Sequence, residues 1–175
     1  HYPADDGEGL DAACDIGTTT VVCHLIDGKT GEKLATVSEP SAQRSFGADV
    51  LSRIQAAEAG KLEILKEQII FQIAQMLRTL QKKTGRGEQI QRLAVVGNTV
   101  MCHLFAGISP VSIGVTPFMP QEFFGKEYTG EQLGLTDCRS VYIAPAVAGF
   151  VGGDITSDLL AVMQKKPKDK VLLLD

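Results

Sequence analysis

The chain has 175 residues, of which 44% are hydrophobic, and a formal net charge of −4. This length and composition allow one sizeable hydrophobic core. An acidic balance, no basic block and 6% aromatic residues disfavour nucleic-acid binding, which needs a cationic surface. No apolar run approaches the roughly 20 residues of a membrane helix. We therefore expect neither nucleic acid nor membrane as a partner.

The cysteines Cys14, Cys23, Cys102 and Cys138 form no C-x-x-C pair, and three of them lie in apolar stretches. A free cysteine in such a stretch behaves as a small buried hydrophobe. Adjacent residues on a strand point to opposite faces, so a pair such as Cys23 and His24 makes a poor metal cluster. We expect reduced cysteines and a cytoplasmic protein.

The first part of the chain predicts a meander. Residues 1–9 are polar and glycine-rich, as is typical of a lead-in or linker. Apolar patterns then predict strands at 10–16, 19–26 and 32–38, with a strong turn signal before the third. Successive strands with short connections pair antiparallel.

Helical spacing follows the meander. Apolar residues recur at helical steps over 47–59 and again from Leu62 to Leu80, with Gly60 between the two patterns. Glycines after Thr84 predict the helix end. We interpret the apolar stripe of the longer helix as core packing.

The remaining chain alternates strands and helices. Strands are predicted at 90–96 and 141–145, with helices at 99–105 and from 154 to about 164. Residues 108–140 carry several prolines and glycines, which predicts an irregular insertion. The apolar run at 171–175 is typical of a buried strand. Because the chain opens on His1 and closes on this run, we interpret it as part of a longer protein.

This order predicts an α/β fold: a mixed five-stranded sheet with an antiparallel meander and helices on both faces. It is the order of a ribonuclease-H-like subdomain. No G-x-G-x-x-G follows a strand, so a Rossmann site is unsupported, and the absence of G-x-x-x-x-G-K-[ST] excludes a P-loop.

The stretch D-I-G-T-T-T lies between the first two predicted strands. Gly17 allows a tight turn, and successive amides in a turn form an anion-binding concavity. Thr18, Thr19 and Thr20 add hydroxyl donors, and Asp15 can hold Mg²⁺ through water. We predict a nucleotide phosphate loop, with a plain hairpin turn as the alternative.

Two later turns carry candidate residues. Asp154 can cap the helix beginning at Ile155, or it can orient water or a metal's water shell at a strand end, where Gly152 and Gly153 admit a ligand. Asn98 can cap its own helix or contact phosphate or a residue across the cleft. The sequence leaves both pairs of roles open.

Three further features have simpler interpretations. Asp49 and Arg53 are spaced as an i,i+4 ion pair. His103 is interpreted as a packed histidine. The apolar segment 116–124 predicts a flap over the core, with a partner-docking surface as the alternative.

Four ordered blocks resemble the reductive activators of corrinoid proteins, which belong to the actin-like superfamily. The blocks are D-I-G-T-T at 15–19, F-G-A-D-V-L-S-R-I at 46–54, V-G-N-T-V-M-C-H-L-F at 96–105 and A-G-F-V-G-G-D-I at 148–155. The resemblance implies that residues 10–166 are the first ribonuclease-H-like subdomain of a C-terminal ATPase domain, and that 167–175 begin a second subdomain.

By resemblance, the whole protein uses ATP and Mg²⁺ to deliver an electron to a corrinoid methyl-transfer protein, reducing cob(II)alamin to cob(I)alamin. A two-iron cluster is implied for a ferredoxin-like domain outside this chain. By resemblance, residues 15–20 match the first phosphate loop, and Gly152, Gly153 and Asp154 match the segment that links the two subdomains. We predict Asp15 and Asp154 as catalytic, and the nucleotide contacts as Asp15, Gly17, Thr18, Thr19, Thr20, Asn98, Gly152 and Gly153.

The resemblance implies the corrinoid protein and the second ATPase subdomain as partners, and homodimerisation stays open. Half a nucleotide site should bind ATP weakly or not at all, because half of the contacts are missing. The alternatives are a small-molecule kinase of the same superfamily, of the acetate or sugar type, and a non-catalytic, nucleotide-gated binding module.

Overall fold

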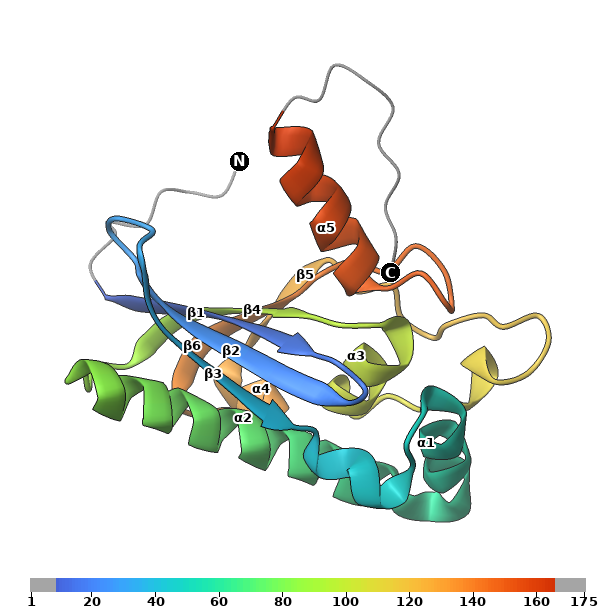
Figure 1. The fold of residues 1–175 in the computed structure, drawn as a ribbon. Helices are drawn as coiled ribbons and strands as arrows, with labels where there is room; N and C mark the ends of the chain where they lie inside the picture. Colours follow the sequence, from blue (N-terminus) through green and yellow to red (C-terminus); the bar gives the residue numbers. More distant parts are fainter. Residues whose placement is uncertain (1–8, 166–175) are drawn as a thin grey trace.

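A computed structural model describes residues 9–165 of the chain. One six-stranded mixed sheet, ordered β3-β2-β1-β4-β6-β5, forms its centre (Figure 1). Most of the expected lead-in, the expected strand at 171–175 and the expected second subdomain at 167–175 lie outside the described residues.

The strands confirm the predicted meander and the mixed sheet. The three meander strands are β1 (Leu10–Ile16), β2 (Thr20–Asp27) and β3 (Lys33–Pro40). Two strands run parallel to β1, namely β4 (Ile90–Val96) and β6 (Cys138–Ile143), and β5 (Lys126–Thr129) pairs antiparallel with β6.

The predicted strand count of five is wrong because β5 lies inside the expected irregular insertion at 108–140. Its sequence, K-E-Y-T, lacks the apolar alternation of a half-buried strand, and only Tyr128 packs against the core. Pairing with β6 therefore forms this edge strand, and no local pattern indicates it.

Helices cover both faces of the sheet, as predicted. The α-helices are α1 (Val50–Ala56), α2 (Leu62–Thr84), α3 (Thr99–Ala106), α4 (Gly130–Leu133) and α5 (Gly153–Gln164). Short turns of other helix types occupy Ala42–Phe46, Ala57–Lys61 and Val111–Ile113. Helix α2 packs on β2 and β3, whereas α5 contacts β4 from the opposite side (Figure 1).

The core lies between the sheet and α2. Alternation along β1 buries Leu10, Cys14 and Ile16 on the α2 side and turns Asp11 and Asp15 to the other face. The apolar stripe of α2 is core packing, as interpreted from the sequence; its buried residues include Leu65, Ile69, Ile73, Met76, Leu77 and Leu80.

All four cysteines are buried, but the expectation that all are reduced is wrong. The antiparallel register places Cys14 of β1 directly opposite Cys23 of β2, and the two form a disulfide. Cys102 and Cys138 are free thiols. The error arose because burial was inferred without the register between the two strands.

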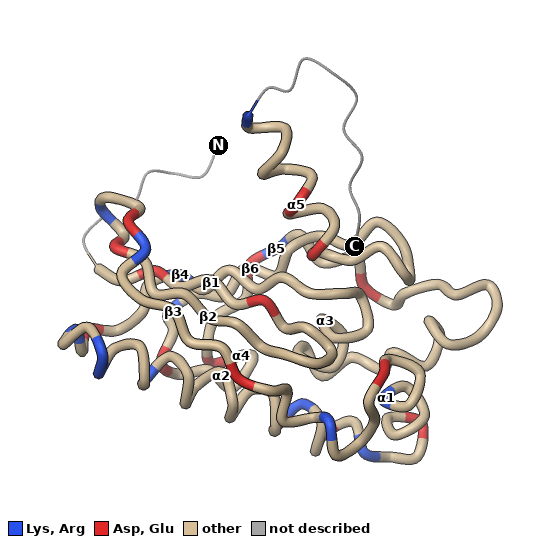
Figure 2. Tube along the Cα trace, viewed as in Figure 1, with Lys and Arg blue, Asp and Glu red and all other residues tan. Residues whose placement is uncertain are grey.

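Basic residues are distributed along the described chain. Lys and Arg occur at both ends of α2, in α1 and in the β2–β3 turn (Figure 2). Within residues 9–165, no helix combines the length and apolarity needed to cross a membrane.

Replacing Ile73 by Ala should lower the free energy of unfolding by about 2–5 kcal/mol, because the side chain is fully buried beneath the sheet. Phe71 lies on the same helix but is 66% exposed, so Phe71→Ala should change the free energy by no more than about 0.5 kcal/mol. Urea unfolding of both variants measures the difference. Equal losses would contradict this assignment of the core face.

Candidate functional site

Three connections meet at one edge of the sheet. Strands β1, β4 and β6 are parallel, so their carboxyl ends point the same way (Figure 1). Asp15, near the end of β1, lies beside Val96, the last residue of β4. The β1–β2 loop, the β4–α3 turn and the β6–α5 connection, which carry the site residues predicted from the sequence, therefore leave the sheet at the same edge.

The β1–β2 loop is tightly built. A Cβ atom at Gly17 would lie 2.6 Å from the carbonyl oxygen of Thr20, so only glycine fits there. The backbone N–H of Ser41 donates to the carbonyl oxygen of Thr19 at 2.9 Å. Thr19 and Thr20 are exposed, as is Asp15 on the sheet face that α5 contacts. The loop therefore presents hydroxyls and a carboxylate at the edge of the sheet.

Asn98 joins this loop to α3. Its side-chain oxygen accepts from the backbone N–H of Met101 at 3.0 Å, which confirms the predicted N-cap. Its side-chain amide also donates to the hydroxyl of Thr18 at 3.0 Å. Asn98 thus also contacts a residue of the β1–β2 loop, and a contact with phosphate stays a prediction.

The β6–α5 connection packs against the same turn. A Cβ atom at Gly152 would lie 2.6 Å from both the Cα of Asn98 and the backbone nitrogen of Thr99. The hydroxyl of Thr99 donates to the carbonyl oxygen of Ala148 at 2.7 Å. The backbone of Gly152 therefore lies directly against the β4–α3 turn, which sets the start of α5.

The prediction that Asp154 is the N-cap of α5 is wrong. Gly152 occupies the cap, and Asp154 lies in the first turn, where its carboxylate accepts from the N–H of Ile155 at 2.8 Å. Its own N–H donates to the carbonyl oxygen of Gly97 at 3.3 Å. A carboxylate in the first turn interacts favourably with the helix dipole.

Asp15 and Asp154 both influence the pKa of one buried thiol, that of Cys102. Burial raises the pKa of Cys102 well above its usual value, and the negative charges of Asp154 and Asp15 raise it further. Asp15 is paired with Val96 at the end of β4, and the N–H of Asp154 donates to the carbonyl oxygen of Gly97, the next residue. The backbones of the two predicted catalytic acids thus lie beside the same turn.

The structure contradicts the predicted ion pair between Asp49 and Arg53. Asp49 is the N-cap of α1 and accepts from the N–H of Ser52 at 2.8 Å. Among the ion pairs of the described chain, none involves Arg53. Its guanidinium is instead fully buried and donates to the carbonyl oxygen of Thr18. The i,i+4 spacing predicted an ion pair on a helix surface, and it did not indicate that Arg53 is buried against the β1–β2 loop.

His103 is packed, as interpreted from the sequence. Its Nδ1 lies 2.7 Å from the carbonyl oxygen of Thr99, and its Nε2 accepts from the N–H of Glu122 at 3.3 Å. Phe124 packs edge-on against the ring. The segment 116–124 thus covers the core only in part, since Phe118, Met119 and Phe123 are exposed.

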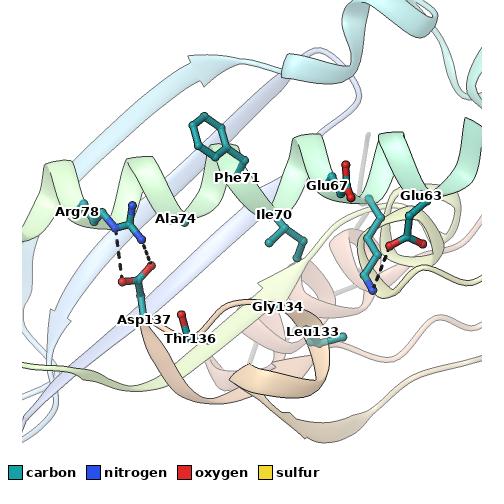
Figure 3. A pocket seen from close by; sticks show the side chains of 11 residues that line it. Glu63, Glu67, Ile70, Phe71, Ala74, Arg78, Leu133, Gly134, Thr136 and Asp137 are labelled. Carbon is teal, nitrogen blue, oxygen red and sulfur yellow. Dashed lines mark hydrogen bonds and ion pairs between the residues drawn. The ribbon is translucent and has the colours of Figure 1, made fainter.

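Grooves also lie away from this edge. One, of about 430 Å³, separates α2 from the loop after α4; the Arg78–Asp137 ion pair lies at one end and the Lys66–Glu63 pair at the other (Figure 3). Another, of about 470 Å³, lies on the sheet face near Leu160. Neither is lined by a predicted site residue.

Comparisons with known proteins agree on one family. Residues 10–166 match the family model described as the RACo middle region. The corrinoid activation enzyme RamQ of Eubacterium limosum is 33% identical over 167 residues, which cover 93% of this chain and 28% of that protein.

A solved structure described as a reductive activator for corrinoid, iron-sulfur protein superposes with a TM-score of 0.87 at 33% identity. The match covers 94% of this chain and 27% of the other. The chain therefore spans little more than a quarter of the length of either relative.

Gly152→Ala should separate the start of α5 from the β4–α3 turn, because the new methyl group would meet backbone atoms that cannot rotate away. We expect a loss of about 1–3 kcal/mol in the free energy of unfolding. Gly87→Ala is the matched control, since nothing lies within 4 Å of its added Cβ. Equal stability of both variants in urea would contradict the close packing at Gly152.

His103 should make stability depend on pH. Burial lowers its pKa, and the smaller effects of the Thr99 carbonyl and Glu122 oppose this. Because the unfolded chain then binds the proton at higher pH, the free energy of unfolding should fall as pH drops below about 6.5, by at most about 1.4 kcal/mol per unit.

The measurement is urea unfolding at pH 7.5 and 5.5, with His103→Gln as the comparison. The variant should lose less stability than the parent chain between these pH values. The pKa of His24 is also lowered, but His24 is present in both proteins and cancels in the difference. The same pH dependence in both would show that His103 does not contribute.

Proposed function

The chain belongs to the family of the RACo middle region, and on this premise we propose that it forms half of the nucleotide site in an ATP-dependent reductive activator of corrinoid proteins. The observation that carries the proposal is the joining of the β1–β2 loop to the β4–α3 turn by the Asn98–Thr18 hydrogen bond. The same turn supports Gly152 at the start of α5.

The donors at this edge suit a phosphate group. The hydroxyls of Thr18, Thr19 and Thr20, with the backbone amides of the turn at Gly17, would bind phosphate oxygens. Asn98 would contribute to phosphate binding indirectly, because its side-chain amide donates to the hydroxyl of Thr18 and positions it. Gly152 and Gly153 are both buried and pack against Asn98 and Ala144, so they would contribute by placing the start of α5 beside this edge.

The acids at this edge suit a hydrated magnesium ion. Within residues 9–165 no group of three or more His, Cys, Asp or Glu residues could hold a metal. Mg²⁺ keeps several waters and is commonly held by one or two carboxylates together with substrate phosphates, and Asp15 fits that role. When bound, Mg²⁺ would neutralise phosphate charge, and Asp154 would orient a water molecule near it.

We propose that residues 10–166 form the first ATPase subdomain, with 1–9 as a linker and 167–175 leading to the second subdomain. Helix α5 has an exposed apolar surface that a further segment could cover. Leu159, Leu160 and Met163 on this surface are each more than half exposed. Burying such side chains stabilises an interface by about 1.5–3 kcal/mol each.

In the whole protein, an iron–sulfur domain would pass one electron to a corrinoid protein, converting cob(II)alamin to cob(I)alamin. The two relatives support this partner, since their descriptions name corrinoid activation. ATP binding and hydrolysis between the two subdomains would drive the domain movement that makes this reduction possible. A cytoplasmic location remains part of the proposal, although the Cys14–Cys23 disulfide removes the argument for it from reduced cysteines.

Asp15→Ala in the whole protein should lower ATP-stimulated cob(I)alamin formation by about 10- to 100-fold, the range for losing an outer-shell metal contact. The absorption spectrum of the iron–sulfur cluster should not change. The measurement is the appearance of cob(I)alamin absorbance on a cob(II)alamin-loaded corrinoid protein, with and without ATP.

Asp137→Ala is the control, because Asp137 pairs with Arg78 beside the distant groove. Unchanged ATP stimulation in Asp15→Ala would refute the role of Asp15. Phosphate transfer to added acetate or a sugar would instead favour a kinase.

A further inference from the structure

Arg53 lies beneath the β1–β2 loop with its whole side chain buried. Its guanidinium donates to four acceptors on three segments. These are the carbonyl oxygen of Thr18, the side-chain oxygen of Gln43 at 3.3 Å, the sulfur of Met101 at 2.9 Å and the carbonyl oxygen of Gly47 at 3.4 Å. One side chain therefore joins the loop to α3 and to the connection before α1.

None of these acceptors carries a charge. Burial lowers the pKa of Arg53 to about 10, and the weaker attraction of Asp49 raises it. The guanidinium is thus still protonated at neutral pH. A buried charge is costly unless it is paired or well hydrogen-bonded. The fold therefore retains a positive charge whose hydrogen-bond acceptors are all uncharged, directly under the loop that we propose to bind phosphate.

The bond to Thr18 also orients the loop. In a planar trans peptide, the C=O of one residue and the N–H of the next point in opposite directions. Because the carbonyl of Thr18 points inward at Arg53, the N–H of Thr19 points away from the guanidinium. The hydroxyl of Thr18 is fixed separately by Asn98.

We infer that Arg53 is a positioning residue for the loop at 15–20, which it holds in the anion-accepting conformation and supplies with a buried positive charge selective for the phosphate groups of a nucleotide. The inference rests on the proposed function for its ligand, but the positioning of the loop can be tested without one. Arg53 touches no reacting atom in this role.

The test uses the whole protein and the variants Arg53→Met and Arg53→Lys. Lysine keeps a charge but, as a compact ammonium group, cannot span four separate acceptors. Arg78→Met is the matched control, because Arg78 is half exposed and pairs with Asp137 away from this edge. Amide hydrogen exchange is measured without ligand, and calorimetry measures binding of Mg-ATP and of adenosine.

We expect exchange of the Ser41 N–H, which donates to the carbonyl oxygen of Thr19 in the loop, to rise about tenfold or more in both Arg53 variants, the size expected for losing a hydrogen bond to a charged group. Exchange in α2 should stay unchanged, which separates a local effect from general destabilisation. Affinity for Mg-ATP should fall about tenfold in Arg53→Met, while affinity for adenosine should not change.

The outcomes separate the two claims. Exchange of the Ser41 N–H equal to that of the parent protein in a folded Arg53 variant would overturn the inference. If Arg53→Met does not fold, Arg53→Lys decides. If the parent protein binds no ATP but this exchange rises in the variants, the proposed function fails and the positioning role stands. Equal losses of ATP and adenosine affinity would reject selectivity for phosphate.

Discussion

The amide group of Asn98 makes the two hydrogen bonds on which the carboxyl edge of the sheet depends. Its oxygen caps α3, and its nitrogen holds the hydroxyl of Thr18. Because the amide is one planar group, the start of α3 and the β1–β2 loop cannot move independently. The backbone of Gly152 lies against the same residue. One residue thus contacts three connections that are far apart in the sequence: its side chain bonds the loop and the start of α3, and its backbone packs against Gly152.

Elements with a local signal could be predicted from the sequence. Strand β1 has the predicted bounds because alternation and its flanking residues are local, and α2 ends where Gly85 adopts a left-handed conformation. Strand β5 gave no such signal, since its extended conformation is stabilised by pairing with β6. The sequence therefore predicted the α/β class and the mixed sheet but not the edge strand.

The candidate site was predictable where glycine and polar residues follow strands, which identified the three connections. Arg53 was missed because a spacing rule for exposed helices paired it with Asp49, whereas burial decides its contacts. The cap of α5 was misassigned because Gly152 packs on Asn98 and shifts the helix start by backbone contact. Both features depend on contacts between segments that are far apart in the sequence, and neither composition nor local spacing predicts such contacts.

The Cys14–Cys23 disulfide encloses the candidate phosphate loop in a covalent ring. The bond joins residues nine apart, just before Asp15 and three residues after Thr20. Ring closure fixes the separation of the loop's two ends whatever happens to the hydrogen bonds around them. The two strands that carry the loop therefore cannot part at this point, and a movement between the proposed subdomains would carry the loop with β1 and β2 as one unit.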